Sequence, residues 1–178
     1  LNSKFKMRDL GQVATYLGVE FVHKSDGSIA MHQQRYITDV LRRFGMDECK
    51  PVSTPLPPGL DLSKLATTEH PDCNIQYRAL VGALQYMSWT RPDIAQAVSE
   101  LSRFSGNYTD EHYKVGKHLL RYLKGTLDQA IVYGKISGGG QLQLEIYSDA
   151  SFASDAKTRR SQPASSTCPK HATSLCLR

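Results

Sequence analysis

The sequence predicts an α+β protein in which a β-hairpin comes first and a series of amphipathic helices follows. Near the start, two runs of alternating apolar residues flank an Asp-Gly pair, which is a common signal for a hairpin. Later segments repeat apolar residues at helical spacing. The chain has 178 residues, 40% of them hydrophobic and 22% charged. This is enough for one ordinary domain or two small ones, and it argues against wholesale disorder.

The predicted hairpin covers residues 16–34 and turns at residues 24–27. Gly18, in the middle of a strand, would allow another backbone to approach closely. The off-core face carries polar groups, as the wet face of an antiparallel sheet commonly does. The core-facing residues are Val13, Leu17, Val19, Phe21, Ile29 and Met31.

A first helix is predicted directly after the hairpin, and Gly45 supplies its C-terminal stop. Residues 49–74 contain prolines at short intervals, so we expect a loop there. The apolar face of the helix consists of Tyr36, Ile37, Val40, Leu41 and Phe44.

Three more helices are predicted between residues 75 and 125. The second of these begins at Thr90, which would form a capping box with Asp93. The third is capped by Thr109 and ends at Gly125. Small residues in the first helix would let another element approach closely: Ala79, Gly82 and Ala83. The predicted core positions of the three helices are Tyr77, Leu80, Val81, Leu84, Met87, Ile94, Ala97, Val98, Leu101, Phe104, Val115, Leu119, Tyr122 and Leu123.

A second β region is predicted toward the C-terminal end. A short strand around residues 131–133 and the glycine run 138–140 precede an alternating strand that leads to Asp149. The glycine run is the best domain boundary in the chain. From residue 162 onward the sequence has no periodicity and contains two prolines, so we expect residues 162–178 to be an unstructured tail.

Asp149 is the sharpest candidate for metal chemistry, because a carboxylate at the end of a strand can face a metal site. A metal-dependent nuclease needs several carboxylates around two cations that lie roughly 3.5–4 Å apart. One further acid, Asp155, follows in the sequence, so we expect the site to be incomplete. The competing interpretation is a strand-end carboxylate that accepts hydrogen bonds from a turn.

A basic stripe is predicted on the last helix, on the face opposite its apolar residues. Such a row could lie along a phosphate backbone and release counterions on binding. The competing interpretation is the solvated face of an amphipathic helix. The stripe consists of Lys114, Lys117, His118, Arg121 and Lys124.

The net charge, the cysteines and the apolar runs indicate which kinds of partner and which cellular compartment to expect. The net charge of +5 suggests an anionic partner, nucleic acid being the commonest, although many globular proteins are equally basic. The four cysteines are scattered, which is typical of reduced thiols in an intracellular protein. The apolar runs are too short to span a membrane. No motif for a small-molecule ligand or a zinc ion is present, and nothing indicates the oligomeric state.

The order of several short motifs resembles the Pol polyprotein of copia-type retrotransposons, in the part that follows the reverse transcriptase active site. The resemblance covers about residues 5–161. The motifs that carry it are Tyr16-Leu17-Gly18-Val19-Glu20, Thr90-Arg91-Pro92-Asp93-Ile94 and Tyr147-Ser148-Asp149-Ala150, together with segments 5–11, 32–37, 77–86 and 120–126.

The resemblance implies a place for each part of the chain. Residues 1–48 would be the end of the palm, with a primer-grip-like hairpin and the first thumb helix, followed by a proline-rich loop at 49–74. Residues 75–136 would be the helical thumb and connection. Residues 141–161 would be the truncated start of an RNase H domain, an incomplete RNase H-like strand with Asp149 as its first metal-binding carboxylate.

The resemblance also implies a function. The parent protein would polymerise DNA on an RNA template with Mg²⁺ and hydrolyse RNA–DNA hybrids. This sequence contains no Asp-Asp pair, so we expect a piece that holds no cofactor and is inactive alone, and whether it is an enzyme stays open. Sequence-independent binding of a hybrid or duplex would use Tyr16, Leu17, Gly18, Lys114, Lys117, Arg121 and Lys124.

The family pattern stops after Ser161. The family continues with a Thr-Ser-Gly-aromatic-Val strand, whereas this chain reads Gln162-Pro163. We hypothesise a frameshift near Ser161, which sequencing of the coding DNA would test. Two alternatives to a nucleic-acid-binding fragment stay open: a non-catalytic helical module that binds a protein, and a pseudogene product that does not fold.

Overall fold

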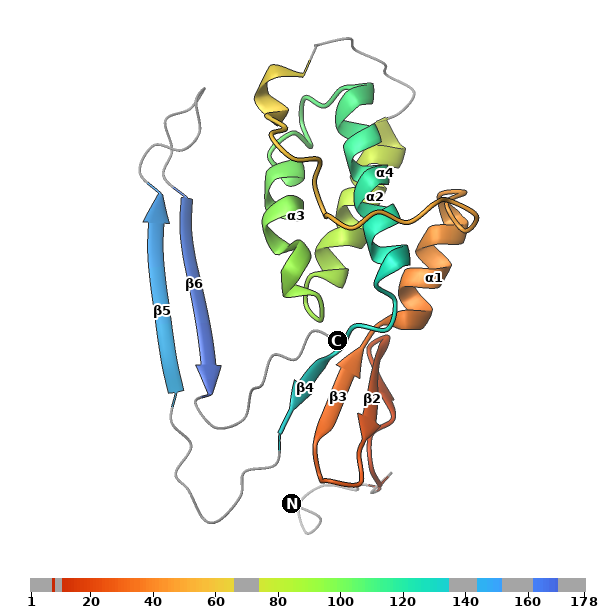
Figure 1. Cartoon of the computed structure of the whole chain (residues 1–178), viewed down its shortest axis with the longest axis vertical. Coiled ribbons are helices and arrows are strands. Elements are labelled where there is room, and N and C mark those ends of the chain that lie inside the picture. The colour runs from red at the N-terminus through yellow and green to blue at the C-terminus, as the bar shows by residue number, and fades with distance from the viewer. Residues whose placement is uncertain (1–7, 9–10, 66–73, 135–143, 152–161, 170–178) are drawn as a thin grey trace.

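The computed structural model describes residues 8, 11–65, 74–134, 144–151 and 162–169. For the last two ranges it describes the backbone. Among these residues, four α-helices accompany a four-stranded and a two-stranded antiparallel sheet (Figure 1). The predicted α+β class is therefore confirmed.

The four-stranded sheet has the order β1-β2-β3-β4 and is antiparallel throughout. The predicted hairpin is confirmed as β2 (Val19–His23) and β3 (Ile29–His32), and Gly27 in its turn has a φ of 83°. The two-residue strand β1 (Thr15–Tyr16) pairs with β2. The short strand β4 (Ile131–Tyr133) pairs with β3, a partner that the sequence did not predict.

Four α-helices form the other part of the described structure, and each corresponds to a predicted helix. They are α1 (Gln34–Arg43), α2 (Asn74–Met87), α3 (Ala95–Ser102) and α4 (Asp110–Gly125). The predicted loop contains one short 3-10 helix, η1 (Leu62–Lys64). None of the described helices has the length and apolar character needed to cross a membrane.

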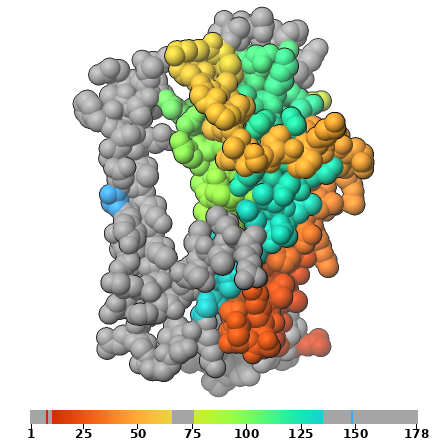
Figure 2. Space-filling model, in the orientation of Figure 1, coloured from red at the N-terminus to blue at the C-terminus, as the bar shows by residue number. Residues whose placement is uncertain are grey.

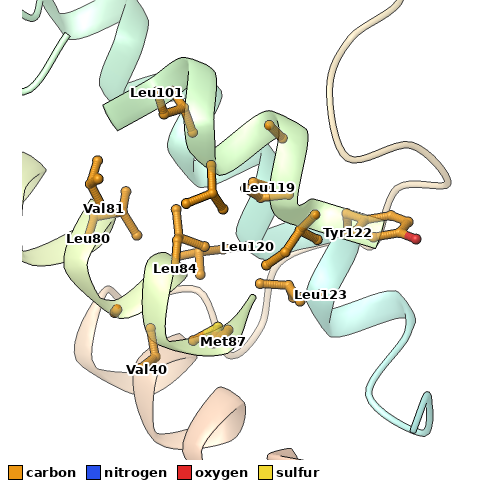
Figure 3. Packing of buried hydrophobic residues seen from close by; sticks show 14 of the residues in the cluster. Val40, Leu80, Val81, Leu84, Met87, Leu101, Leu119, Leu120, Tyr122 and Leu123 are labelled. Carbon is orange, nitrogen blue, oxygen red and sulfur yellow. The ribbon is translucent and has the colours of Figure 1, made fainter. Parts of the chain in front are cut away.

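The hydrophobic core forms between the helices, and Figure 3 shows its centre. The predicted core positions of α2, α3 and α4 are buried, apart from Phe104, which is partly buried. On α1, Ile37, Val40 and Leu41 are buried, while Tyr36 and Phe44 pack against the same cluster. The periodicity of the sequence thus predicted the buried faces correctly.

The closest approach between α2 and α4 occurs at Gly116 of α4. A Cβ atom added there would lie 2.7 Å from Cδ2 of Leu80, which is fully buried. The predicted approach at Ala79 and Gly82 of α2 is wrong, because both residues are exposed and no atom lies within 4 Å of a Cβ added to Gly82. Ala83, the third small residue predicted on α2, is buried in the core, and Gly116 of α4 is the glycine that lets these helices meet.

A buried arginine holds the junction between α2 and α3. Arg91 is 1% exposed, and its Nε and one terminal nitrogen donate to the two carboxylate oxygens of Asp93 at 2.9 and 2.7 Å. The same side chain donates to the carbonyl and the hydroxyl of Thr126 at 2.9 and 2.6 Å. The hydroxyl of Tyr122 donates to Asp93 at 2.8 Å. The start of η3 (Pro92–Ile94) is thereby tied to the end of α4.

The capping box predicted at this junction does not form. The hydroxyl of Thr90 instead donates to Oε1 of Gln33 at 2.8 Å, and both residues are 1% exposed. The residue before η3 is Arg91, which makes no side-chain cap. The predicted cap of α4 is present, since the backbone N–H of Thr109 donates to Nδ1 of His112 at 3.1 Å. Thr90 therefore joins the helices to the end of the hairpin rather than capping a helix.

Two strands lie near the C-terminal end of the described chain. The backbone of β6 (Gln162–Pro169) pairs antiparallel with β5 (Leu144–Ser151) along its whole length. The predicted unstructured tail is therefore wrong for these eight residues. Asp149 lies within β5 rather than at its end. The predictions for the glycine run 138–140 and for residues 170–178 lie outside the described residues.

Replacing Arg91 with methionine is expected to destabilise the fold by about 3–5 kcal/mol, because it leaves the Asp93 carboxylate buried without its cationic partner. Urea unfolding followed by circular dichroism measures the loss. Arg42→Met is the matched control, since Arg42 pairs with Asp39 at 3.3 Å on the exposed surface. We expect that control to lose no more than about 0.5 kcal/mol. Equal losses in the two variants would contradict the role of Arg91.

The same pair predicts a dependence of stability on pH. Burial alone raises the pKa of Asp93, but the hydrogen bonds and charge of Arg91 and the Tyr122 hydroxyl outweigh it, so the pKa lies below its ordinary 3.8. The stabilisation is thus present above about pH 4 and is lost as the pH falls through the lower folded pKa. In Arg91→Met, the effect of burial is no longer outweighed and raises the pKa of Asp93. Protonation of Asp93 at low pH then removes the unpaired buried charge, so the variant loses less stability. Unfolding curves below pH 4 should therefore show a narrowing gap between the two proteins, and a constant gap would refute the linkage.

Candidate nucleic-acid interface

The turn between β1 and β2, here termed the hairpin tip (residues 16–18), lies at the opposite end of β2 from the Gly27 turn and is fixed to the end of α2. Leu17 and Gly18, which connect β1 to β2, have positive φ values of 49° and 75°. The hydroxyl of Tyr86 donates to the carbonyl of Leu17, and a Cβ added to Gly18 would lie 3.2 Å from that hydroxyl. Tyr86 also meets Tyr36 edge-on, with ring centroids 4.9 Å apart. The close neighbour predicted at Gly18 is therefore a tyrosine side chain rather than another backbone.

Large apolar side chains stay exposed around this tip. Tyr16 is 63% exposed and Leu17 is 72% exposed, although the sequence placed Leu17 on the core face. Trp89, which sequence reasoning missed, is 80% exposed. It lies in the turn that follows α2, three residues after Tyr86. Trp89 falls outside the helical spacing of the buried α2 residues, and this is the sequence signal that could have identified it as exposed.

The polar face of the hairpin is partly used inside the protein. The carboxylate of Glu20 forms an ion pair with Nε of Arg35 at 2.9 Å and accepts a hydrogen bond from the backbone N–H of Arg35 at 3.3 Å. Its other contact is Nδ1 of His32 at 3.3 Å. These bonds join β2 to the first turn of α1, so the carboxylate is a structural link between the sheet and the helices.

The basic stripe of α4 lies beneath the proline-rich loop. Nζ of Lys124 donates to the carbonyls of Asp47 and Cys49, the latter at 2.8 Å. Nε of Arg121 donates to the carbonyl of Lys50 at 2.7 Å. His118 contacts the carbonyl of Thr54 through Nε2 at 3.0 Å. In Figure 2 the loop, coloured orange to yellow, lies over the green to teal surface of the helices.

The N-terminal half of the stripe reaches solvent. Lys114 is 68% exposed at its side chain and pairs with Glu111 at 2.6 Å, and this hydrogen bond and charge raise the pKa of Lys114. Nζ of Lys117 lies 4.9 Å from the centre of the Tyr113 ring, a cation–π contact. Of the predicted phosphate-binding side chains, Lys114 is exposed and Lys117 is half-buried beside Tyr113, while Arg121 and Lys124 are half-buried and bonded to loop carbonyls.

The described residues do not assemble a metal centre. Among them, no group of three or more His, Cys, Asp or Glu side chains is placed to hold a metal ion. The backbone of Asp149 lies opposite Ala164 of β6, a strand that contains no acidic residue. The described donor set therefore does not fit a pair of Mg²⁺ ions, and a metal role for Asp149 stays a prediction.

Comparison with known proteins gives a consistent set of relatives. Residues 1–58 match the family described as reverse transcriptase (RNA-dependent DNA polymerase). The chain is 41% identical over 155 residues to the retrovirus-related Pol polyprotein from transposon RE1 of Arabidopsis thaliana, covering 87% of the chain and 10% of that protein. It is 40% identical over 168 residues to the corresponding polyprotein from transposon TNT 1-94 of Nicotiana tabacum, covering 90% and 12%.

A shorter relative also matches most of the chain. An uncharacterized mitochondrial protein of Arabidopsis thaliana is 37% identical over 161 residues, which cover 90% of this chain and 65% of that protein. This chain spans about a tenth of the length of the transposon polyproteins that it matches. No solved structure matches it significantly.

Gly18→Ala is expected to loosen the hairpin tip. An alanine there must adopt the positive φ of 75°, at a cost of roughly 1–2 kcal/mol, and its Cβ must also displace the Tyr86 hydroxyl. Gly59→Ala is the matched control, because Gly59 has a φ of 71° but no atom within 4 Å of an added Cβ. Hydrogen exchange should accelerate in β1 and β2 in the first variant alone. Unchanged exchange in these strands would show that the contact with Tyr86 does not hold the tip.

Proposed function

This chain belongs to the copia-type family of retrovirus-related transposon Pol polyproteins, with a reverse transcriptase match in its first 58 residues, and from this premise we propose that it binds nucleic acid. The ligand is an RNA–DNA hybrid or a duplex, bound through its backbone and independently of sequence. The surface used is the hairpin tip together with the exposed part of the α4 basic stripe.

The observation that carries the proposal is the exposure of Tyr16 and Leu17 at a fixed hairpin tip, with Trp89 exposed just after α2. Tyr16, Leu17 and Trp89 remain largely exposed while Tyr86 and Glu20 hold the surrounding backbone in place. Large exposed apolar side chains on an anchored element commonly mark a binding surface. Aromatic rings there can stack on bases or pack on sugars without reading the sequence.

The basic stripe supplies the attraction to phosphates. The exposed Lys114 and the half-buried Lys117 support this proposal, because each phosphate that they would neutralise releases counterions. Arg121 and Lys124 donate to loop carbonyls, which leaves their positive charge uncancelled and adds it to the stripe. The net charge of +5 has the sign that this mode of binding requires.

Binding, rather than metal-dependent chemistry, is the role proposed for this chain. DNA synthesis with Mg²⁺ and cleavage of RNA in a hybrid are proposed for the longer relatives. Polymerisation would require an adjacent pair of aspartates, which this sequence lacks. Hybrid cleavage would require further carboxylates around Asp149.

A salt series with a labelled RNA–DNA hybrid tests the proposal by filter binding. The affinity should fall steeply with salt, and replacing both Lys114 and Lys117 with glutamine should reduce the logarithmic slope by about 0.7–0.9 for each phosphate that is no longer neutralised. Lys64→Gln is the control, because Lys64 is 82% exposed, pairs with Asp61 on η1 and is not part of the α4 stripe. It should leave the slope unchanged. No binding even at low salt would refute the proposal and favour a module that binds a protein partner.

A further inference from the structure

A groove runs between α4 and the segment 57–65, and its two walls differ in chemistry. Its volume is about 380 Å³. One wall is apolar and consists of Pro57, Leu60 and Leu65. The other wall is α4, where Lys114, Lys117 and Arg121 supply cationic groups around an otherwise apolar lining that includes Val115. Glu111 is the carboxylate that also lines the groove, so the positive charge predominates there.

The loop orients Arg121 toward this groove. Its Nε is occupied by the carbonyl of Lys50 at 2.7 Å, while the side chain as a whole lines the groove. Within the described part of the chain the two terminal guanidinium nitrogens have no hydrogen-bond partner, so they are the donors that a ligand could use. A guanidinium held in this way presents a planar fork that matches a phosphate.

The side chain of Lys117 also has reduced conformational freedom before any ligand binds. Its ammonium group lies 4.9 Å from the centre of the Tyr113 ring, and the hydroxyl of Tyr113 donates to Gln76 of α2 at 3.2 Å. The lysine thus rests on a ring that a neighbouring helix holds in place. A ligand phosphate would meet two cations whose freedom is already reduced, which lowers the entropy cost of binding.

We propose that this groove binds one unpaired nucleotide of a single nucleic-acid strand. The base would lie against Leu60 and Leu65, and its phosphate would be bound by Arg121 and Lys117. A ligand with one flat apolar part and one anionic part matches the two unlike walls. The volume lies at the small end of the roughly 300–1,000 Å³ typical of ligand sites, so it suits one nucleotide rather than a duplex. The inference rests on the proposed binding of nucleic acid and assigns the unpaired strand to a groove that shares Lys114 and Lys117 with the proposed hybrid surface.

Fluorescence anisotropy with the full chain tests the groove, using labelled oligothymidine as the single strand and a blunt RNA–DNA hybrid as the second probe. Leu65→Glu places a carboxylate against the base and should weaken binding of the single strand roughly tenfold or more. Lys117→Gln, which changes a half-buried side chain beside Tyr113, should weaken it about fivefold. Lys64→Gln is the matched control and should have no effect. Circular dichroism confirms that each variant is folded.

The outcomes separate this inference from the proposed function. If oligothymidine does not bind, or if Lys117→Gln leaves its affinity unchanged, the groove proposal is wrong whatever the hybrid does. If the single strand binds through the groove while the blunt hybrid does not bind at all, the duplex proposal is the one that fails. Competition identifies what is recognised: thymidine monophosphate should displace the oligonucleotide at lower concentration than inorganic phosphate does. Equal competition would show that no base is bound and would overturn the inference.

Discussion

The buried ion pair between Arg91 and Asp93 is the interaction on which the arrangement of the helices depends. Two charges leave water at a high cost, which good geometry and complete hydrogen bonding must offset. Arg91 meets this condition through Asp93 and Thr126, and Asp93 gains a further donor from Tyr122. The pair therefore closes the connection between α2 and α3 and binds it to the end of α4.

The sheet is attached to the helices at the same junction. Thr90, next to Arg91, donates to Gln33 just before α1, and the chain leaving α4 returns to pair β4 with β3. The bond from Tyr86 to Leu17 adds an attachment at the hairpin tip. Because these links come from distant parts of the sequence, they hold in place the backbone that carries the exposed side chains of the tip. Such preorganisation reduces the entropy that a ligand must overcome on binding.

Side-chain spacing predicted the hairpin, the helices and most of the core, because these features depend on local periodicity. It did not predict the burial of Arg91, since arginine is seldom buried unless paired, and Thr126 lies 35 residues away. The hydroxyl of Thr90 was assigned to a cap because its partner Gln33 is equally remote. Strand β6 lacks an alternating pattern, but pairing with β5 satisfies its backbone without one. The stripe on α4 was evident from spacing, whereas the loop that covers part of it was not.

The kind of partner that each basic residue has decides what it can contribute to binding. A loop carbonyl accepts a hydrogen bond from Arg121 or Lys124 without cancelling the positive charge. Glu111, by contrast, offsets much of the field of Lys114. The side chains that the loop fixes therefore keep their full charge and, in the proposed binding mode, would attract phosphates over a distance. Lys117, resting on Tyr113, keeps both its charge and its access to solvent. Partial coverage of the stripe by the loop is thus compatible with binding, because the loop restrains the donors and leaves the electrostatic attraction in place.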